Sequence, residues 1–326
     1  MSKNDKKPEW GNISGNYYIK KAVWDYAYKF FRLILLFGLC FLILQPILDK
    51  ISVSFMGRND LYDGTVISIP RNFTLDNYLL VNQLMGYWPS LFQTLIVVLS
   101  SAVLQIAACT LAGYGFARFK FPLKNFWFVC VMLIIIIPPH TIMSSLYLNF
   151  RFFNILGIKV NLLNSVMGLF LLSATGMGLK SGLYIFMLRQ YFRGMPKELE
   201  EAAWVDGCGK FKTFIRIMLP DAAPMLTSCF LFSFVWQWTD SFYSTLFLNN
   251  YRMLSKGLGG LAERFAQWWA ATYVSAGSSV SSFAPVAQTQ MMLATGMLMC
   301  LIPLILLYLI AQKAFVESLS QTGIKM

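Results

Sequence analysis

Long apolar runs alternate with short polar stretches along almost the whole chain. The runs cover about residues 30–48, 88–113, 125–148, 165–188, 222–248 and 290–312. A helix needs about 20 apolar residues to cross the hydrocarbon core of a bilayer, so each run predicts one transmembrane helix. The pattern predicts an all-α, polytopic membrane protein with about six transmembrane helices. We expect a polar N-terminal segment at residues 1–32 and a membrane domain at residues 33–326.

Helix breakers interrupt two of these runs. Pro138-Pro139 falls inside the third run, where two prolines are expected to kink or break a helix. The fourth run is rich in glycine between Gly176 and Gly182, which predicts bending or close helix packing. Residues 249–289 are expected to form a long loop between the last two helices.

Composition agrees with a membrane protein, and charge gives it an orientation. The chain is 57% hydrophobic and 13% charged, whereas soluble domains have about 25% charged residues. Most of the 27 Lys and Arg residues lie on the side of the N-terminus when the runs are threaded through a bilayer. Because cytoplasmic loops carry the excess of basic residues, both termini are expected in the cytoplasm. The net charge of +12 therefore requires no nucleic-acid partner.

No combination of residues predicts catalysis or a metal site. The chain has one His and six scattered Cys, which gives no zinc pattern and no Ser-His-Asp arrangement. Gly209-Lys210 is the nearest approach to a phosphate-binding loop, but Phe211 occupies the position that needs Ser or Thr. We expect no catalytic residue, no metal and no cofactor bound by this chain.

A polar stretch at about residues 190–220 separates the fourth and fifth runs. Pro196 suits a first helical position, and the acidic residues that follow favour the positive end of a helix dipole. Asp206-Gly207 is expected to end that helix, because Gly readily adopts the left-handed conformation found after helix C-termini. A second helix is expected over residues 210–218, and Pro220 is expected to stop it.

This stretch resembles a known motif. Glu201-Ala202-Ala203, then Gly207, then Ile217-x-Leu219-Pro220 is similar to the EAA signature of permease subunits of binding-protein-dependent ABC importers. The chain looks most like the maltose-type carbohydrate permeases, over roughly residues 80–326. The resemblance implies a type I importer fold whose EAA loop couples to an ATPase. The residues that it assigns to coupling are Glu200, Glu201, Ala202, Ala203, Asp206, Gly207, Ile217, Leu219 and Pro220.

The resemblance also implies partners and a location. It implies a second, related permease, two ATPase subunits that use ATP and Mg²⁺, and an extracytoplasmic solute-binding protein. It places the chain in the cytoplasmic membrane of a bacterium or archaeon. The implied solute is an oligosaccharide or a related glycan fragment.

Five polar or aromatic residues within the apolar runs are candidates for the translocation pathway. Lys180 lies nine residues before Arg189, about 13 Å deeper along a helix, so it faces a cavity or subunit interface, or else extends to the membrane surface. The other candidates are Trp236, Gln237, Trp238 and Asp240. Aromatic, amide and carboxylate groups suit sugars, although an interfacial aromatic belt is an equal alternative.

Two other functions are alternatives to import. An ion-coupled secondary transporter of a small solute needs acidic residues within the membrane, and Asp240 is the clear candidate in the apolar runs. A membrane scaffold without transport activity does not require the EAA-like loop. Loss of ATPase coupling on substitution of Glu201 and Gly207 is expected only for the importer.

Overall fold

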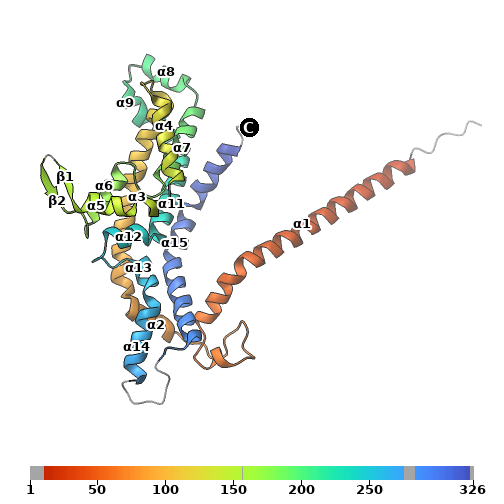
Figure 1. Cartoon of the computed structure of the whole chain (residues 1–326). Helices are drawn as coiled ribbons and strands as arrows, with labels where there is room; N and C mark the ends of the chain where they lie inside the picture. The colour runs from red at the N-terminus through yellow and green to blue at the C-terminus, as the bar shows by residue number, and fades with distance from the viewer. Residues whose placement is uncertain (1–10, 156, 275–282, 324–326) are drawn as a thin grey trace, which may run out of the picture. The chain divides into compact units, whose positions relative to one another are not determined.

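The computed structural model describes residues 11–155, 157–274 and 283–323 (Figure 1). The chain divides into two compact units, residues 1–74 and residues 75–326, and each is described here by itself. Helices α1 and α15, the longest in the described part, belong to the first and second unit respectively.

The first unit consists of one long helix and a closed loop. Helix α1 spans Gly11–Ser54, so it extends beyond the predicted run in both directions and includes part of the predicted polar segment. The loop contains the short helix η1, Asp60–Tyr62. The Asp60 carboxylate accepts hydrogen bonds from the backbone N–H of Asn72 at 2.8 Å and from its side-chain amide at 2.7 Å. The stacked rings of Phe55 and Phe73, 4.7 Å apart, close the base of the loop.

In its described residues, the second unit consists of helices and a small hairpin. Its helices up to the signature stretch are α2 (Asp76–Met85), α3 (Tyr87–Arg118), α4 (Lys124–Ile136), η2 (Pro139–Ile142), α5 (Met143–Arg151), α6 (Val166–Ala174) and α7 (Ser181–Gly194). The signature stretch and the helix after it comprise α8 (Glu198–Val205), α9 (Lys210–Thr213), η3 (Phe214–Met218), α10 (Leu219–Asp221) and α11 (Ala223–Thr239). The remaining helices are α12 (Phe242–Phe247), α13 (Leu254–Gly259), α14 (Leu261–Trp269), η4 (Ala270–Val274) and α15 (Val286–Gly323). Strands β1 (Phe153–Ile155) and β2 (Ile158–Val160) pair antiparallel.

Helix α3 is the central element of the second unit. It has no proline after its first turn and packs against α6, α7 and α11. Its approach to α7 is close, because a Cβ added to Gly113 would lie 2.9 Å from the Cβ of Leu188. Buried Tyr184, Phe192 and Met218 belong to the apolar core at this junction.

Three of the predicted transmembrane helices are continuous, and the other three are broken. Lys21–Ser54, Tyr87–Arg118 and Val286–Lys313 are long and apolar enough to cross a membrane. Two bent pairs pass the same test together. Lys124–Ile136 meets Pro139–Arg151 at 100°, and Lys210–Asp221 meets Ala223–Thr239 at 75°. The break at Pro138-Pro139 confirms the expected effect of those prolines.

The fourth run also forms two helices instead of the continuous one expected. Helices α6 and α7 are separated by a turn at residues 175–180, where Gly176 has a φ of +69° and Lys180 a φ of +62°. Glycines lower the cost of leaving the helix here, and left-handed residues cannot continue a right-handed one. Close packing at the far side of the break is confirmed, because a Cβ on Gly182 would lie 2.8 Å from the carbonyl oxygen of Val131.

Candidate functional site

The signature stretch begins with α8, whose two ends follow from local chemistry. Three acidic residues occupy its first turn, and Lys197 is its N-cap, so Pro196 lies just before the helix and not at its first position. The helix ends at Val205, and Gly207 takes the left-handed conformation with φ +78°. The amide of Cys208 donates to the carbonyl of Ala203 at 2.8 Å, which closes the end of the helix. The predicted termination at Asp206-Gly207 is confirmed.

Glu200 anchors α8 to the end of α3. Its carboxylate accepts a 2.7 Å hydrogen bond from the hydroxyl of Tyr114. The Nε atom of Arg118 lies 3.5 Å from the other carboxylate oxygen, and both side chains are only 7% exposed. Arg118 also donates to the carbonyl of Met195 at 2.8 Å. A single arginine of α3 therefore holds the chain on both sides of Pro196.

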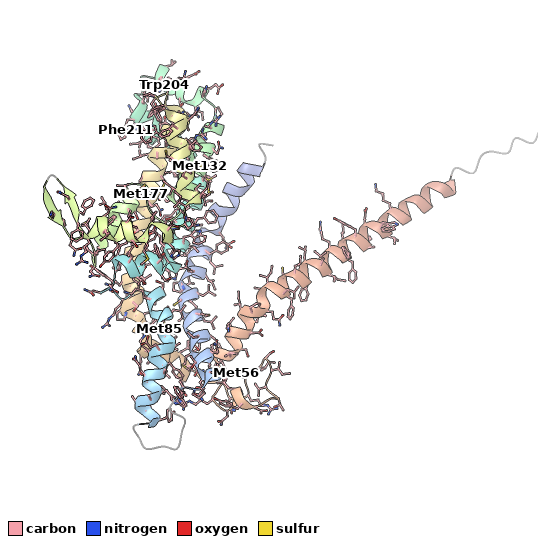
Figure 2. All side chains as sticks on the ribbon, in the orientation of Figure 1. Met56, Met85, Met132, Met177, Trp204 and Phe211 are labelled. Atoms are coloured by element: carbon pink, nitrogen blue, oxygen red, sulfur yellow. The ribbon has the colours of Figure 1, made fainter. Side chains whose placement is uncertain are left out.

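The opposite face of α8 is open. Glu201, Ala202, Asp206 and Gly207 are exposed, whereas Ala203 is buried. Trp204 is 48% exposed and Val205 is 88% exposed, although both are apolar. Phe211, at the start of α9, is 73% exposed, and Figure 2 shows it at the same end of the unit as Trp204. These exposed apolar residues of the signature stretch, Ala202, Trp204, Val205 and Phe211, are together called the α8 patch below.

The second half of the signature stretch does not end at Pro220 as expected. Helix α9 leads through the π-helical segment η3 into α10 without a break, and Pro220 is exposed. The helical segment runs from Lys210 to Asp221, so Pro220 lies in its last turn, directly after the π-helical segment. The chain instead bends by 75° before α11. Ile217 and Leu219 are half-buried.

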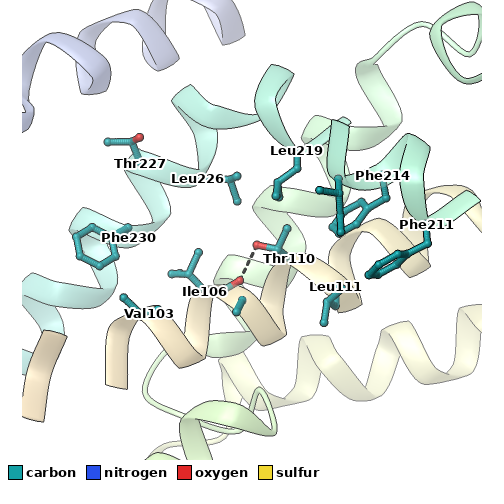
Figure 3. Close-up of a pocket in the computed structure, with 12 residues that line it drawn as sticks. Val103, Ile106, Thr110, Leu111, Phe211, Phe214, Leu219, Leu226, Thr227 and Phe230 are labelled. Carbon is teal, nitrogen blue, oxygen red and sulfur yellow. Dashed lines mark hydrogen bonds between the residues drawn. The ribbon is translucent and has the colours of Figure 1, made fainter. Parts of the chain in front are cut away.

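An apolar cavity of about 600 Å³ lies between this segment and α3 (Figure 3). Its lining includes Ile106 and Leu111 of α3, Phe214 and Leu219 of the signature stretch, and Phe230 of α11. The segment from α9 to α10 therefore forms one wall of this apolar cavity.

Lys180 and Trp236 are brought together by the fold. Lys180 lies in the turn between α6 and α7, and its ammonium group is 5.1 Å from the centre of the Trp236 ring on α11. Trp236 is 46% exposed and Lys180 is partly exposed. A cation over the face of a tryptophan is favourable, so the pair forms one defined group.

The other three pathway candidates have neighbours of their own. Gln237 is buried and donates to the side-chain oxygen of Gln105 at 2.7 Å. Trp238 is buried, and its indole N–H donates to the carbonyl of Cys300 at 3.2 Å. Asp240 accepts from the backbone N–H of Ser244 at 3.1 Å, near the start of α12.

Sequence reasoning missed Gln105. This side chain is fully buried in α3 and bonds to α7 and α11. A lone amide in the middle of an apolar run was the available signal, because polar groups in a membrane helix need partners. In the described part of the chain, no cluster of three His, Cys, Asp or Glu residues is placed to hold a metal.

Apolar helices long enough to cross a membrane, some continuous and some broken, with a charged helix–turn–helix at one end, are the features of a multi-pass membrane protein. Residues 109–321 match the family described as "Binding-protein-dependent transport system inner membrane component", and the chain belongs to this family. The resemblance drawn from the EAA-like motif is confirmed. Membership places the chain among ABC permeases and not among ion-coupled secondary transporters.

Known proteins support this assignment over most of the chain. A probable ABC transporter permease protein of Pyrococcus horikoshii is 32% identical over 65% of this chain and 74% of its own length. An arabinooligosaccharides transport system permease protein of Halalkalibacterium halodurans is 26% identical, covering 88% of this chain and 93% of its own. A bacterial ABC transporter involved in the import of the acidic polysaccharide alginate has the same fold, with a TM-score of 0.67 and 19% identity. That match covers 95% of this chain and 100% of the other.

Proposed function

We propose that this chain is a permease subunit of an ATP-driven importer, in which it forms half of the translocation pathway beside a second, related permease. The observation that carries the proposal is the α8 patch. Val205 is 88% exposed at the tip of a helix that Glu200 fixes firmly to α3. An exposed apolar patch on a firmly held helix suits docking to a partner.

The partner at this end is an ATPase subunit, one of two in the assembly. Ala202 permits close approach, while Trp204 and Val205 supply apolar contact. The exposed Glu201 carboxylate suits a basic residue of the ATPase. Glu200 works differently, because its ion pair with Arg118 passes movement of α8 to α3. ATP and Mg²⁺ are used in the ATPase subunits, and this chain supplies no catalytic group.

The solute is a carbohydrate, an oligosaccharide or glycan fragment delivered by an extracytoplasmic binding protein. Relatives named for oligosaccharide transport support this class. The Lys180–Trp236 pair fits it chemically, since an indole face packs on sugar C–H groups and an ammonium group donates to hydroxyls. The excess of basic residues on the inner side supports a cytoplasmic membrane location in a bacterium or archaeon, with both termini in the cytoplasm.

Substitution of Val205 tests the coupling surface. Val205→Asp puts a charge into the proposed contact, so we expect affinity for the ATPase to fall roughly tenfold to a hundredfold, from the loss of one buried side chain. Val286→Asp is the matched control, because Val286 is 77% exposed and lies at the start of α15, outside the signature stretch. The measurement is the amount of ATPase that co-purifies with the tagged chain from native membranes. Equal recovery with both variants would refute the proposal.

A further inference from the structure

Gln105 is a polar side chain at an unusual depth. It lies 13 residues before Arg118 on α3, about 20 Å along the helix from the end that holds α8. It is fully buried. An amide this far inside a membrane helix is stable only where partners within the protein satisfy it.

Every hydrogen-bonding position of this amide is occupied. The Nε2 atom donates to the carbonyl oxygen of Leu179 at 2.7 Å and to the hydroxyl of Ser181 at 2.6 Å. The Oε1 atom accepts from the hydroxyl of Ser233 at 2.6 Å and from the amide of Gln237 at 2.7 Å. Leu179 offers only a carbonyl acceptor here, so the nitrogen must face it. The four partners therefore fix the orientation of the amide.

The positions of these partners relate Gln105 to the Lys180–Trp236 pair. Its nitrogen holds the residues immediately before and after Lys180. Its oxygen holds Gln237, the residue immediately after Trp236. One side chain on α3 therefore links the neighbours of both members of the pair.

Lys180 needs such a restraint. Its φ of +62° is disfavoured for a residue with a Cβ, and the turn that contains it joins two separate helices. Gly178 in the same turn lets the backbone reach Gln105, because a Cβ there would lie 3.0 Å from Nε2. The close approach of Gly178 to Gln105 and the left-handed conformation of Lys180 therefore occur in the same turn.

We propose that Gln105 is a positioning residue of the transport pathway, whose amide clamps the break between α6 and α7 and so holds Lys180 against Trp236. The assignment of Lys180 and Trp236 to the pathway rests on the proposed function. The clamp itself is a statement about geometry and is tested without transport.

The experiment measures the reactivity of Lys180 directly. The complete transporter in nanodiscs is treated briefly with acetic anhydride, and acetylation of each lysine is followed by mass spectrometry. Gln105→Leu keeps much of the side-chain volume and removes all four bonds. We expect Lys180 to acetylate about tenfold faster, as the loss of one to two net hydrogen bonds predicts. Lys256 reports global loosening, because its ammonium group donates to three backbone carbonyls elsewhere in the unit.

Thr110→Val is the matched control. Thr110 is buried in the same helix, but its hydroxyl donates within that helix, to the carbonyl of Ile106 at 2.5 Å. We expect this variant to leave Lys180 and Lys256 at their wild-type rates. Gly178→Ala is the milder second variant for the case in which Gln105→Leu does not assemble, since its methyl group pushes on the amide. It should also accelerate Lys180 alone.

Two results would overturn the clamp. An unchanged Lys180 rate in Gln105→Leu, or in Gly178→Ala if that variant stands in, shows that the amide does not hold the turn. A parallel rise for Lys180 and Lys256 shows general destabilisation. Failure of the pathway assignment looks different, because Lys180→Met would then transport normally while the acetylation results still support the clamp.

Discussion

The anchor of α8 on α3 allows a sharp comparison between two adjacent glutamates. Glu200→Gln keeps the shape of the side chain but removes its charge, so it breaks the ion pair with Arg118. Glu201→Gln makes the same change at the next residue, which is exposed. The two variants have identical composition. They differ in that the charge lost at Glu200 is buried beside Arg118, whereas the charge lost at Glu201 is exposed.

The magnitude follows from burial. The side chains of Glu200 and Arg118 are each 7% exposed, so water screens their interaction little. Removal of one member of a buried pair typically costs about 3–5 kcal/mol, because the remaining charge has no counter-ion. In the Glu200→Gln variant, Tyr114 can still donate to the side-chain amide oxygen at position 200. We therefore expect a cost at the lower end of this range. About 3 kcal/mol corresponds to a roughly hundredfold rise in the population with α8 detached. At an exposed position such as Glu201 we expect a cost within about 0.5 kcal/mol.

Hydrogen exchange of the amides in α8 measures this population. In nanodiscs, the Glu200→Gln variant should exchange faster over Glu198–Val205, while α3 and α7 keep their wild-type rates. The Glu201→Gln variant should match the wild type when no ATPase is bound. Equal protection of α8 in both glutamine variants would show that the ion pair does not hold the helix, and the reasoning from burial would be wrong.

Two further predictions concern packing and pH. Gly182→Ala should lower stability by about 1–3 kcal/mol, since its Cβ would lie 2.8 Å from a carbonyl oxygen of α4; Gly194→Ala, where a Cβ meets nothing within 4 Å, should not, and thermal unfolding in nanodiscs decides between them. In the first unit, the backbone N–H of Asn72 is the main cause of a lowered pKa for Asp60. The Asp60 carboxylate therefore contributes fully to closing the loop above its ordinary pKa of 3.8. This contribution is lost as the pH falls through the lower pKa that Asp60 has in the folded protein. Limited proteolysis between pH 2 and 6 should show acid opening of the wild-type loop, and Asp60→Asn should weaken this pH dependence, with Asp63 and its ion pair to Arg71 accounting for the rest.

Local chemistry was enough to predict the C-terminal end of α8 and to place its start within two residues. The acidic first turn and Asp206-Gly207 act within a few residues, so sequence alone places a helix between them. The break at Pro138-Pro139 is predictable for the same reason, because proline removes a donor wherever it stands. The class of protein was predicted from the family resemblance of the EAA-like motif, because a hydropathy pattern predicts membrane spans but not what the protein does.

Other features depend on how distant segments meet. The sequence does not tell which of Glu200 and Glu201 faces inward, since the rotation of a short helix is set by α3 beneath it. Gln105 was overlooked because its partners are 74 to 132 residues away in the chain. For the fourth run, the sequence predicted bending and not a full break. Several nearby glycines permit a break at more than one position, and the position at which the helix breaks depends on contacts with Gln105 on another helix.

The unbroken length of α3 has a geometric consequence. Its 32 residues form a rod about 48 Å long. One end is tied to α8 through Tyr114 and Arg118, and the other to α15 through the hydroxyl of Tyr87, which donates to the carbonyl of Met299 at 3.0 Å. A pivot of about 5° around the Tyr87 end moves the Arg118 end by about 4 Å, and the level of Gln105 by about half as much. A rigid helix of this kind converts a large displacement at its Arg118 end into a smaller displacement at the level of Gln105. No flexible segment of α3 lies between these two levels.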